Sequence, residues 1–200
     1  MNLPKGYLSY SALDLWLTSP ERFRRRYYEN KDKFTGNMYT DFGGAIHDKI
    51  ERGEIDVPHG THHEIEIRPT IRGVPLLCRI DSLGLPEGKV YEYKTGKHPW
   101  NDDRVHSHKQ LDLYAAAVRK HYGTYHPTTS LTWLETEVTQ SEVTLPNGYT
   151  MSQPTIQLTG TVHTFLRPID PLTLDEFEKW LCRTANDITE DYQMWLNSRV

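Results

Sequence analysis

A hairpin in the middle of the chain constrains the fold most. Residues 74–81 and 89–96 alternate between apolar and polar side chains, and the Leu85-Pro86-Glu87-Gly88 segment between them is typical of a turn. Upstream, residues 64–67 alternate as well, and Arg72-Gly73 predicts a further turn. We therefore expect three strands in a meander, followed by a helix.

The hairpin carries an unusual set of charges. Strand alternation puts Glu92 and Lys94 on one face and Tyr93 on the other. If the strand that ends near Asp81 pairs with them, two carboxylates and an ammonium meet at a sheet edge. Such a group can hold a divalent cation that activates water, with the ammonium stabilising charge on a phosphate. An isolated Glu-x-Lys pattern is also typical of a solvated strand surface.

Residues 40–52 predict a helix that docks through one face, with Thr40 or Asp41 as its N-cap. The apolar residues recur at four-residue spacing: Phe42, Ile46 and Ile50. His47 follows Gly43 by one turn, and the missing side chain of Gly43 would leave room beside the imidazole. A neutral imidazole is an acceptable ligand for Mn²⁺, although a half-buried, hydrogen-bonded histidine is the simpler interpretation.

A second helix is predicted over residues 104–121. Its apolar stripe consists of Leu111, Tyr114, Ala115 and Val118. Gln110 and Tyr114 stand four apart and share a face, where they can bind a phosphate, a base edge or a metal-bound water. The alternative is a glutamine at the rim of the core and a tyrosine inside it.

Taken together and in order, these motifs resemble the RecB-type branch of the PD-(D/E)XK nuclease superfamily, which includes exonucleases of CRISPR adaptation. The motifs are Gly43-x-x-x-His47, Arg79-Ile80-Asp81, Glu92-Tyr93-Lys94-Thr95-Gly96-Lys97 and Gln110-x-x-x-Tyr114. The N-terminal Leu8-Ser9-Tyr10-Ser11-Ala12-Leu13 is similar to the opening helical segment of the family, with Ser19-Pro20 where a Cys-Pro often stands. The resemblance implies an α/β (α+β) fold, in which helices flank a mixed central sheet around a restriction-endonuclease-like core.

The resemblance also implies roles for individual residues. The metal ligands would be His47, Asp81, Glu92 and the carbonyl of Tyr93, with Mg²⁺ or Mn²⁺ as the ion. The catalytic residues would be Asp81, Glu92, Lys94, Gln110 and Tyr114. The implied activity is hydrolysis of DNA phosphodiester bonds, by an exonuclease that prefers single strands or ends. A catalytically silent DNA-binding or assembly module, or a metal-dependent hydrolase of another substrate, stays an alternative.

Cysteine content sets this chain apart from several members of that branch, which carry four cysteines for an iron–sulfur cluster. Only Cys78 and Cys182 are present, so we expect neither such a cluster nor a zinc ribbon, and we expect both residues in the core. No 18-residue apolar stretch and no secretory signal occurs, which predicts a cytoplasmic protein without a membrane partner. The chain lacks a P-loop, so a helicase or a repair or defence protein would be a separate partner.

The charge of the chain does not by itself indicate a nucleic-acid binder. Its net charge is −4 and its pI is near 6.2. A local basic run around residues 22–33 can nevertheless contact phosphates, and its aromatic residues can stack on unpaired bases. The proposed phosphate contacts are Arg22, Arg25, Arg26 and Lys97; the interleaved aromatics are Phe23, Tyr27 and Tyr28. The alternative is an ordinary charged helix whose aromatics face the core.

The rest of the chain predicts further sheet and a long helix. Residues 130–138 and 155–165 are expected strands around a turn at Pro146-Asn147-Gly148. A capping box opens the C-terminal helix at Thr173, and its apolar stripe packs on the sheet or on the N-terminal helices, or binds a partner. Histidines cluster at residues 59–63 and 98–108, and we expect them at the surface.

We expect residues 1–200 to form one domain. Within it, residues 1–39 would be an N-terminal helical segment, residues 40–122 the catalytic core, and residues 123–200 the extra strands and the C-terminal helix.

Overall fold

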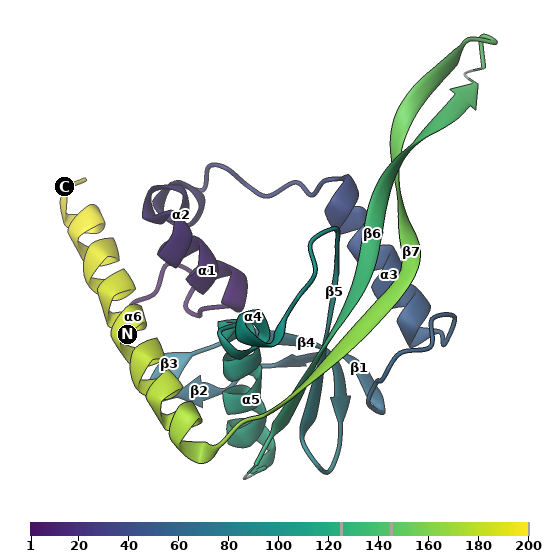
Figure 1. Cartoon of the computed structure of the whole chain (residues 1–200). Coiled ribbons are helices and arrows are strands. Elements are labelled where there is room, and N and C mark those ends of the chain that lie inside the picture. The colour runs from purple at the N-terminus through teal and green to yellow at the C-terminus, as the bar shows by residue number, and fades with distance from the viewer. Residues whose placement is uncertain (125, 145, 200) are drawn as a thin grey trace.

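A five-stranded mixed sheet organises the computed structural model, which describes residues 1–124, 126–144 and 146–199 (Figure 1). The strands lie in the order β1-β4-β5-β6-β7. Their bounds are β1 (His62–Ile67), β4 (Cys78–Gly84), β5 (Lys89–Gly96), β6 (Thr128–Thr144) and β7 (Thr150–Pro168). Only β5 and β6 pair in parallel among these described strands; the other neighbours are antiparallel. The mixed sheet flanked by helices is therefore confirmed.

The predicted strand over residues 74–81 is in fact divided. A small hairpin, β2 (Thr70–Ile71) with β3 (Val74–Pro75), turns at Arg72 and Gly73, whose φ angles are 47° and 80°. The predicted turn at these two residues is confirmed. The backbone of Leu8 then bonds Pro75 and Leu77, at 3.0 Å and 2.9 Å, and so separates β3 from β4.

The helix expected over residues 104–121 is interrupted. The structure has α4 (Asp102–His106) and α5 (Lys109–Tyr122), because His108 adopts an extended backbone with ψ of 97° between them. The His108 ring packs edge-on against Trp100, with 4.9 Å between the ring centroids. The α5 helix crosses from β5 to β6 and is buried along most of its length.

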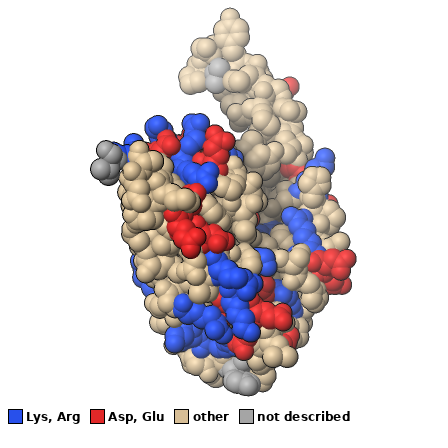
Figure 2. All heavy atoms as spheres, turned by 90° about the vertical axis from the view of Figure 1, so that its left-hand side faces the viewer, with Lys and Arg blue, Asp and Glu red and all other residues tan. Residues whose placement is uncertain are grey.

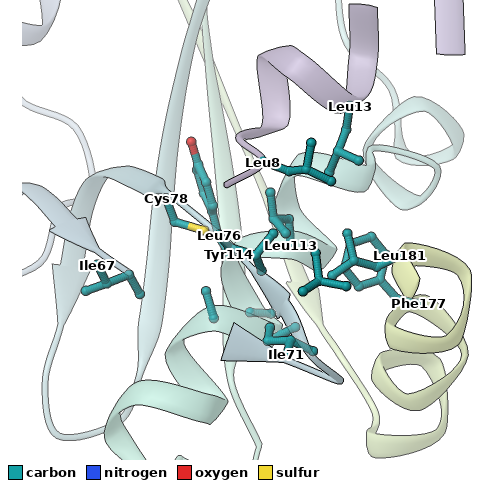
Figure 3. Close-up of a cluster of buried hydrophobic side chains, with 14 of the residues drawn as sticks. Leu8, Leu13, Ile67, Ile71, Leu76, Cys78, Leu113, Tyr114, Phe177 and Leu181 are labelled. Carbon is teal, nitrogen blue, oxygen red and sulfur yellow. The ribbon is translucent and has the colours of Figure 1, made fainter. Parts of the chain in front are cut away.

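The helices cover both faces of the sheet. On one face lies α3 (Met38–Glu51), and on the other lie α5, α6 (Pro171–Asn197), α1 (Tyr10–Thr18) and α2 (Pro20–Tyr27) (Figure 1). The larger core joins these last four helices to the sheet, with Leu113 of α5 packed near Phe177 and Leu181 of α6 (Figure 3). The packing of the C-terminal helix on the N-terminal helices follows the prediction.

Both observed N-caps lie three or four residues before the predicted ones. Asn37 rather than Thr40 or Asp41 caps α3, and its side chain accepts from the backbone of Tyr39 and Thr40. Asp170 rather than Thr173 caps α6, and Asp170 Oδ1 accepts from the Thr173 backbone at 3.0 Å.

Beyond the sheet, β6 and β7 continue as a two-stranded arm in which residues 136–144 pair with residues 150–158 (Figure 1). Both strands extend further than predicted, and the chain turns around residues 146–149. No Lys or Arg occurs between Lys120 and Arg167, so the arm carries no cation. It projects almost uncharged from a surface on which cations and anions mix (Figure 2).

The two cysteines differ in burial. Cys78 is fully buried in the core of the sheet, as expected. Cys182 is only partly buried at the edge of that core, because α6 turns this residue toward the Arg72 turn. Across the described residues, no helix combines the length and the apolar character that crossing a membrane requires.

Candidate active site

The site forms where two inner strands of the sheet part. Backbone pairing between β4 and β5 runs from Gly84↔Lys89 to Ser82↔Tyr91. Beyond it, the side chain of Asp81 replaces a backbone acceptor, since Asp81 Oδ2 accepts from the Tyr93 N–H at 2.9 Å. The expectation of an outer sheet edge is thus corrected to an opening between the central strands.

A third carboxylate lies opposite Asp81 on β1. The pairs His63↔Ser82 and Ile65↔Ile80 flank Glu64, which therefore faces Asp81 across the strands. Its φ of 48° departs from strand geometry. Glu64 is absent from the site residues predicted from the sequence, although it lies in the strand predicted over residues 64–67.

His47 reaches this group from α3. Its Nδ1 lies 3.8 Å from Asp81 Oδ1 and 3.8 Å from Glu64 Oε1. Buried Ile46 and Ile50 hold the helix against β5, and the His47 ring meets the Tyr93 ring edge-on at 5.8 Å.

The glycine one turn before His47 does not serve the imidazole. A Cβ at Gly43 would meet Thr95 Oγ1 at 3.6 Å, an ordinary contact. The expected space beside His47 therefore does not depend on this glycine.

Lys94 joins the strand to α5. Its Nζ donates to Glu92 Oε1 at 2.5 Å and to Gln110 Oε1 at 2.9 Å. Gln110 Nε2 in turn donates to the Tyr114 hydroxyl at 3.0 Å. Gln110 is buried rather than at the rim, and its amide bridges Lys94 and Tyr114. The Tyr114 ring itself belongs to the larger core, in the cluster that includes Leu113 and Cys78 (Figure 3).

Burial and neighbouring charges shift the pKa values of the groups in the site. Burial raises the pKa of Asp81 well above its usual range, and nearby Glu92 raises it further. Burial alone would lower the pKa of Lys94, but Glu92 and Asp81 outweigh it and raise that pKa. Burial and Glu92 also raise the pKa of Tyr114. Lys94 is therefore a cation, and Tyr114 is a neutral hydroxyl.

These residues fit a hard divalent metal. One ligand atom each from His47, Glu64 and Asp81 lies within 4.8 Å of the others. Glu92 Oε2 is buried and has no hydrogen-bond partner among the described residues. Carboxylate oxygens with one imidazole form a donor set that Mg²⁺ or Mn²⁺ accepts, and the buried Glu92 oxygen without a hydrogen-bond partner is a further donor atom that such an ion could use.

The basic run near the N-terminus is only partly engaged by acids. Arg25 Nε pairs with Asp32 at 2.8 Å, and Arg26 Nε donates to the Asp32 carbonyl at 2.9 Å. Arg22 and Lys97 are exposed. Of the interleaved aromatics, Phe23 and Tyr28 are buried in the core, and only Tyr27 is partly exposed. The alternative of aromatics that face the core therefore holds for Phe23 and Tyr28, and only Tyr27 is placed where it can contact a base.

His108 is not the surface residue we expected. Its Nε2 is buried without a partner among the described residues. Burial, with the positive charge of Lys94, lowers the pKa of His108 to about 4. Tyr10 lies beside it, with 5.5 Å between the ring centroids, which places α1 at the border of the site.

Comparison with known proteins gives one family match. Residues 53–198 match the profile of the PD-(D/E)XK nuclease superfamily. A search of curated proteins found no match.

Two solved structures align with the chain. The first, titled "Crystal structure of SSO0001", has 14% identity and a TM-score of 0.46, covering 92% of this chain and 76% of that one. The second is an alkaline exonuclease (LHK-Exo) from Laribacter hongkongensis, with 12% identity and a TM-score of 0.47, covering 97% of this chain and 93% of that one.

Proposed function

The chain belongs to the PD-(D/E)XK nuclease superfamily, and we propose that it is a metal-dependent deoxyribonuclease. One observation carries the proposal. Lys94 lies between Glu92 and Gln110, beside the donor group of His47, Glu64 and Asp81. A lysine next to a hard-metal site is the combination that phosphodiester hydrolysis needs.

The proposed ligands are His47, Asp81 and Glu92, together with the Tyr93 carbonyl and the newly identified Glu64. When bound there, Mg²⁺ or Mn²⁺ would lower the pKa of a water and neutralise charge on the phosphate. Neither an iron–sulfur cluster nor a further cofactor is part of the proposal.

Lys94 is the proposed catalytic cation. Its hydrogen bonds to Glu92 and Gln110 use two of its three N–H groups, and the third would donate to the attacking water or to a phosphate oxygen. Gln110 and Tyr114 would keep the ammonium in position. Because these contacts exist before substrate arrives, little reorganisation would be needed during the reaction.

The proposed substrate is DNA, as single strands or ends, attacked by exonucleolytic cleavage. Arg22, Arg25, Arg26 and Lys97 are the proposed phosphate contacts; the exposure of Arg22, Arg25 and Lys97 supports that role, while Arg26 is partly buried. We further propose that residues 1–200 act as one domain in the cytoplasm, with any helicase or any repair or defence protein as a separate partner.

The test is a cleavage assay on end-labelled single- and double-stranded DNA with Mg²⁺ or Mn²⁺. Wild type should cleave, whereas Lys94→Ala and Asp81→Ala should lose at least about 100-fold in rate. Lys179→Ala, on the exposed side of α6, is the matched control. Cleavage that survives both active-site substitutions would exclude this site, and a folded protein that binds DNA without cleaving it would favour the silent module.

A further inference from the structure

A cavity adjoins the proposed catalytic residues on the side of α1. Its volume is about 340 Å³, and the N-terminal segment, α1, α2, β4 and α5 all contribute to its walls. We call it the tyrosine cavity, after Tyr7, Tyr10, Tyr27 and Tyr114. Gln110, which orients Lys94, lines the same cavity. The cavity thus opens beside the partners of Lys94, the proposed catalytic cation.

The walls of the tyrosine cavity suit a nucleobase. Tyr7, Tyr10 and Tyr27 are all partly exposed. Arg79 lines the cavity with a largely exposed side chain, and the Lys5 ammonium lies 4.8 Å from the centre of the Tyr27 ring. Aromatic rings beside cations bind bases by stacking and the attached phosphates by charge. The volume falls in the range of small-ligand pockets, about 300 to 1,000 Å³.

A second hollow continues from this cavity. It measures about 710 Å³, and it shares Lys5, Ser11 and Tyr27 with the tyrosine cavity. We call it the cationic groove, because its lining includes four cations and, among the described residues, one carboxylate. The cations are Lys5, Arg22, Arg26 and Lys33, and the carboxylate is Asp14. A strand leaving the catalytic residues past Tyr27 would therefore enter a positively charged path.

We propose that the tyrosine cavity receives one unpaired base beside the scissile phosphate, while the cationic groove holds the backbone of the same strand. The inference rests on the proposed nuclease function and names its substrate class. A base enclosed by helices on one side and the sheet on the other cannot keep its pairing partner. The substrate is therefore single-stranded DNA or an end that has been opened.

An abasic scan tests the proposal by binding alone. DNA hairpins with short 5′ or 3′ single-stranded overhangs fix the register, and one abasic site is moved along the overhang. Affinity is measured by fluorescence anisotropy in EDTA, so that no cleavage is needed. One abasic position should weaken binding by wild type about tenfold, the order of one lost base–aromatic stack. Equal binding at every position, or no binding to single strands, would overturn the proposal.

A variant connects the effect to the cavity. In Tyr27→Leu the same abasic position should lower the binding affinity by less than about twofold, because the stacking partner is already gone. Tyr27→Phe should keep the tenfold effect, and Tyr39→Leu, exposed on α3, is the matched control. If the abasic site weakens binding by Tyr27→Leu and by a second variant, Tyr7→Leu, as much as it weakens binding by wild type, the cavity is not the base site. Circular dichroism shows whether each variant is folded.

The two proposals fail separately. If the abasic effect couples to Tyr27 but no DNA is cleaved with metal, the base site stands and the nuclease function falls. If DNA is cleaved but the abasic effect is absent, the nuclease stands and the base site falls.

Discussion

Two glutamates on β1 stand two residues apart and meet different partners. Glu66 pairs with Arg68 at 2.8 Å and with Arg79 at 3.2 Å, both at the surface. Glu64 instead lies 3.8 Å from His47 and faces Asp81. Only Glu64 is therefore in a position to serve as a metal ligand.

This difference predicts unequal effects on metal binding. Glu64→Gln should weaken Mn²⁺ binding about tenfold or more, since it removes an anionic donor. Glu66→Gln should leave the affinity within about twofold, because its charge is engaged elsewhere. Isothermal titration calorimetry of the metal-free protein with Mn²⁺ measures the affinity of both variants. Equal effects of the two substitutions would remove Glu64 from the ligand set.

The burial of Asp81 predicts that the metal-free protein becomes more stable when the charge of this side chain is removed. Its pKa is raised in the folded protein, so the folded state holds a proton that the unfolded state has released above about pH 4. The stability of the metal-free protein therefore falls as pH rises from about 4 toward the folded pKa.

Asp81→Asn should remove this pH dependence. In EDTA at pH 7, the variant should be more stable than wild type by about 1–2 kcal/mol, and at pH 3.5 the difference should be small. Urea unfolding at the two pH values measures it. A variant that is less stable at pH 7 would show that the hydrogen bond to the Tyr93 N–H outweighs the charge.

At the scale of elements, local signals predicted most of the order of helices and strands. Turn residues such as Arg72-Gly73 and the period of residues 89–96 act within a few residues, so the sequence alone carries them. The break between β3 and β4 depends on Leu8, almost 70 positions away, and such a contact leaves no local pattern. The end of α4 likewise depends on the packing of His108 against Tyr10 and Trp100.

The two misplaced caps share one cause. Asn37 with Thr40 and Asp170 with Thr173 each join a cap to the third helical residue. Both members of such a pair are good N-caps by composition, so the sequence cannot say which one begins the helix.

For the site, strand alternation predicted the contact between Glu92 and Lys94. It could not reveal Glu64, whose φ of 48° interrupts the strand geometry on which alternation depends.

The arm of β6 and β7 provides a prediction about one element. It lies outside the main sheet and carries no Lys or Arg, so it contributes no cation to a phosphate backbone. Replacing residues 139–155 by an Asn-Gly turn, between the paired residues Val138 and Ile156, should leave cleavage of short oligonucleotides within about threefold of wild type.

A matched variant keeps the arm but changes its turn, with Tyr149→Ser at an exposed position. Single-turnover cleavage rates and thermal unfolding compare the two variants with wild type. A loss of cleavage in the shortened protein that keeps its melting temperature would assign the arm to substrate binding.

At the scale of the whole molecule, the two ends of the chain hold each other. Arg24 of α2 binds Asp191 of α6 through two hydrogen bonds, at 2.9 Å and 2.6 Å, and the Tyr28 hydroxyl donates to Asp191 at 2.9 Å. Because α2 lines both the tyrosine cavity and the cationic groove, the C-terminal helix indirectly positions the proposed DNA path.

Asp191→Asn should therefore affect stability and substrate binding more than chemistry. The Arg24 hydrogen bond lowers the pKa of Asp191, so its contribution is present above about pH 4 and is lost as pH falls through the lower folded pKa. At pH 7 the free energy of unfolding of the variant should fall by about 1 kcal/mol, a value reduced by solvent screening of the exposed Arg24.

The kinetic effect should lie in binding. KM for single-stranded DNA should rise several-fold while kcat stays within about twofold, because α2 shifts and Lys94 does not. Asp187→Asn, one turn earlier on α6, is the control, and a fall in kcat without a change in KM would contradict the proposed link from α6 to the DNA path.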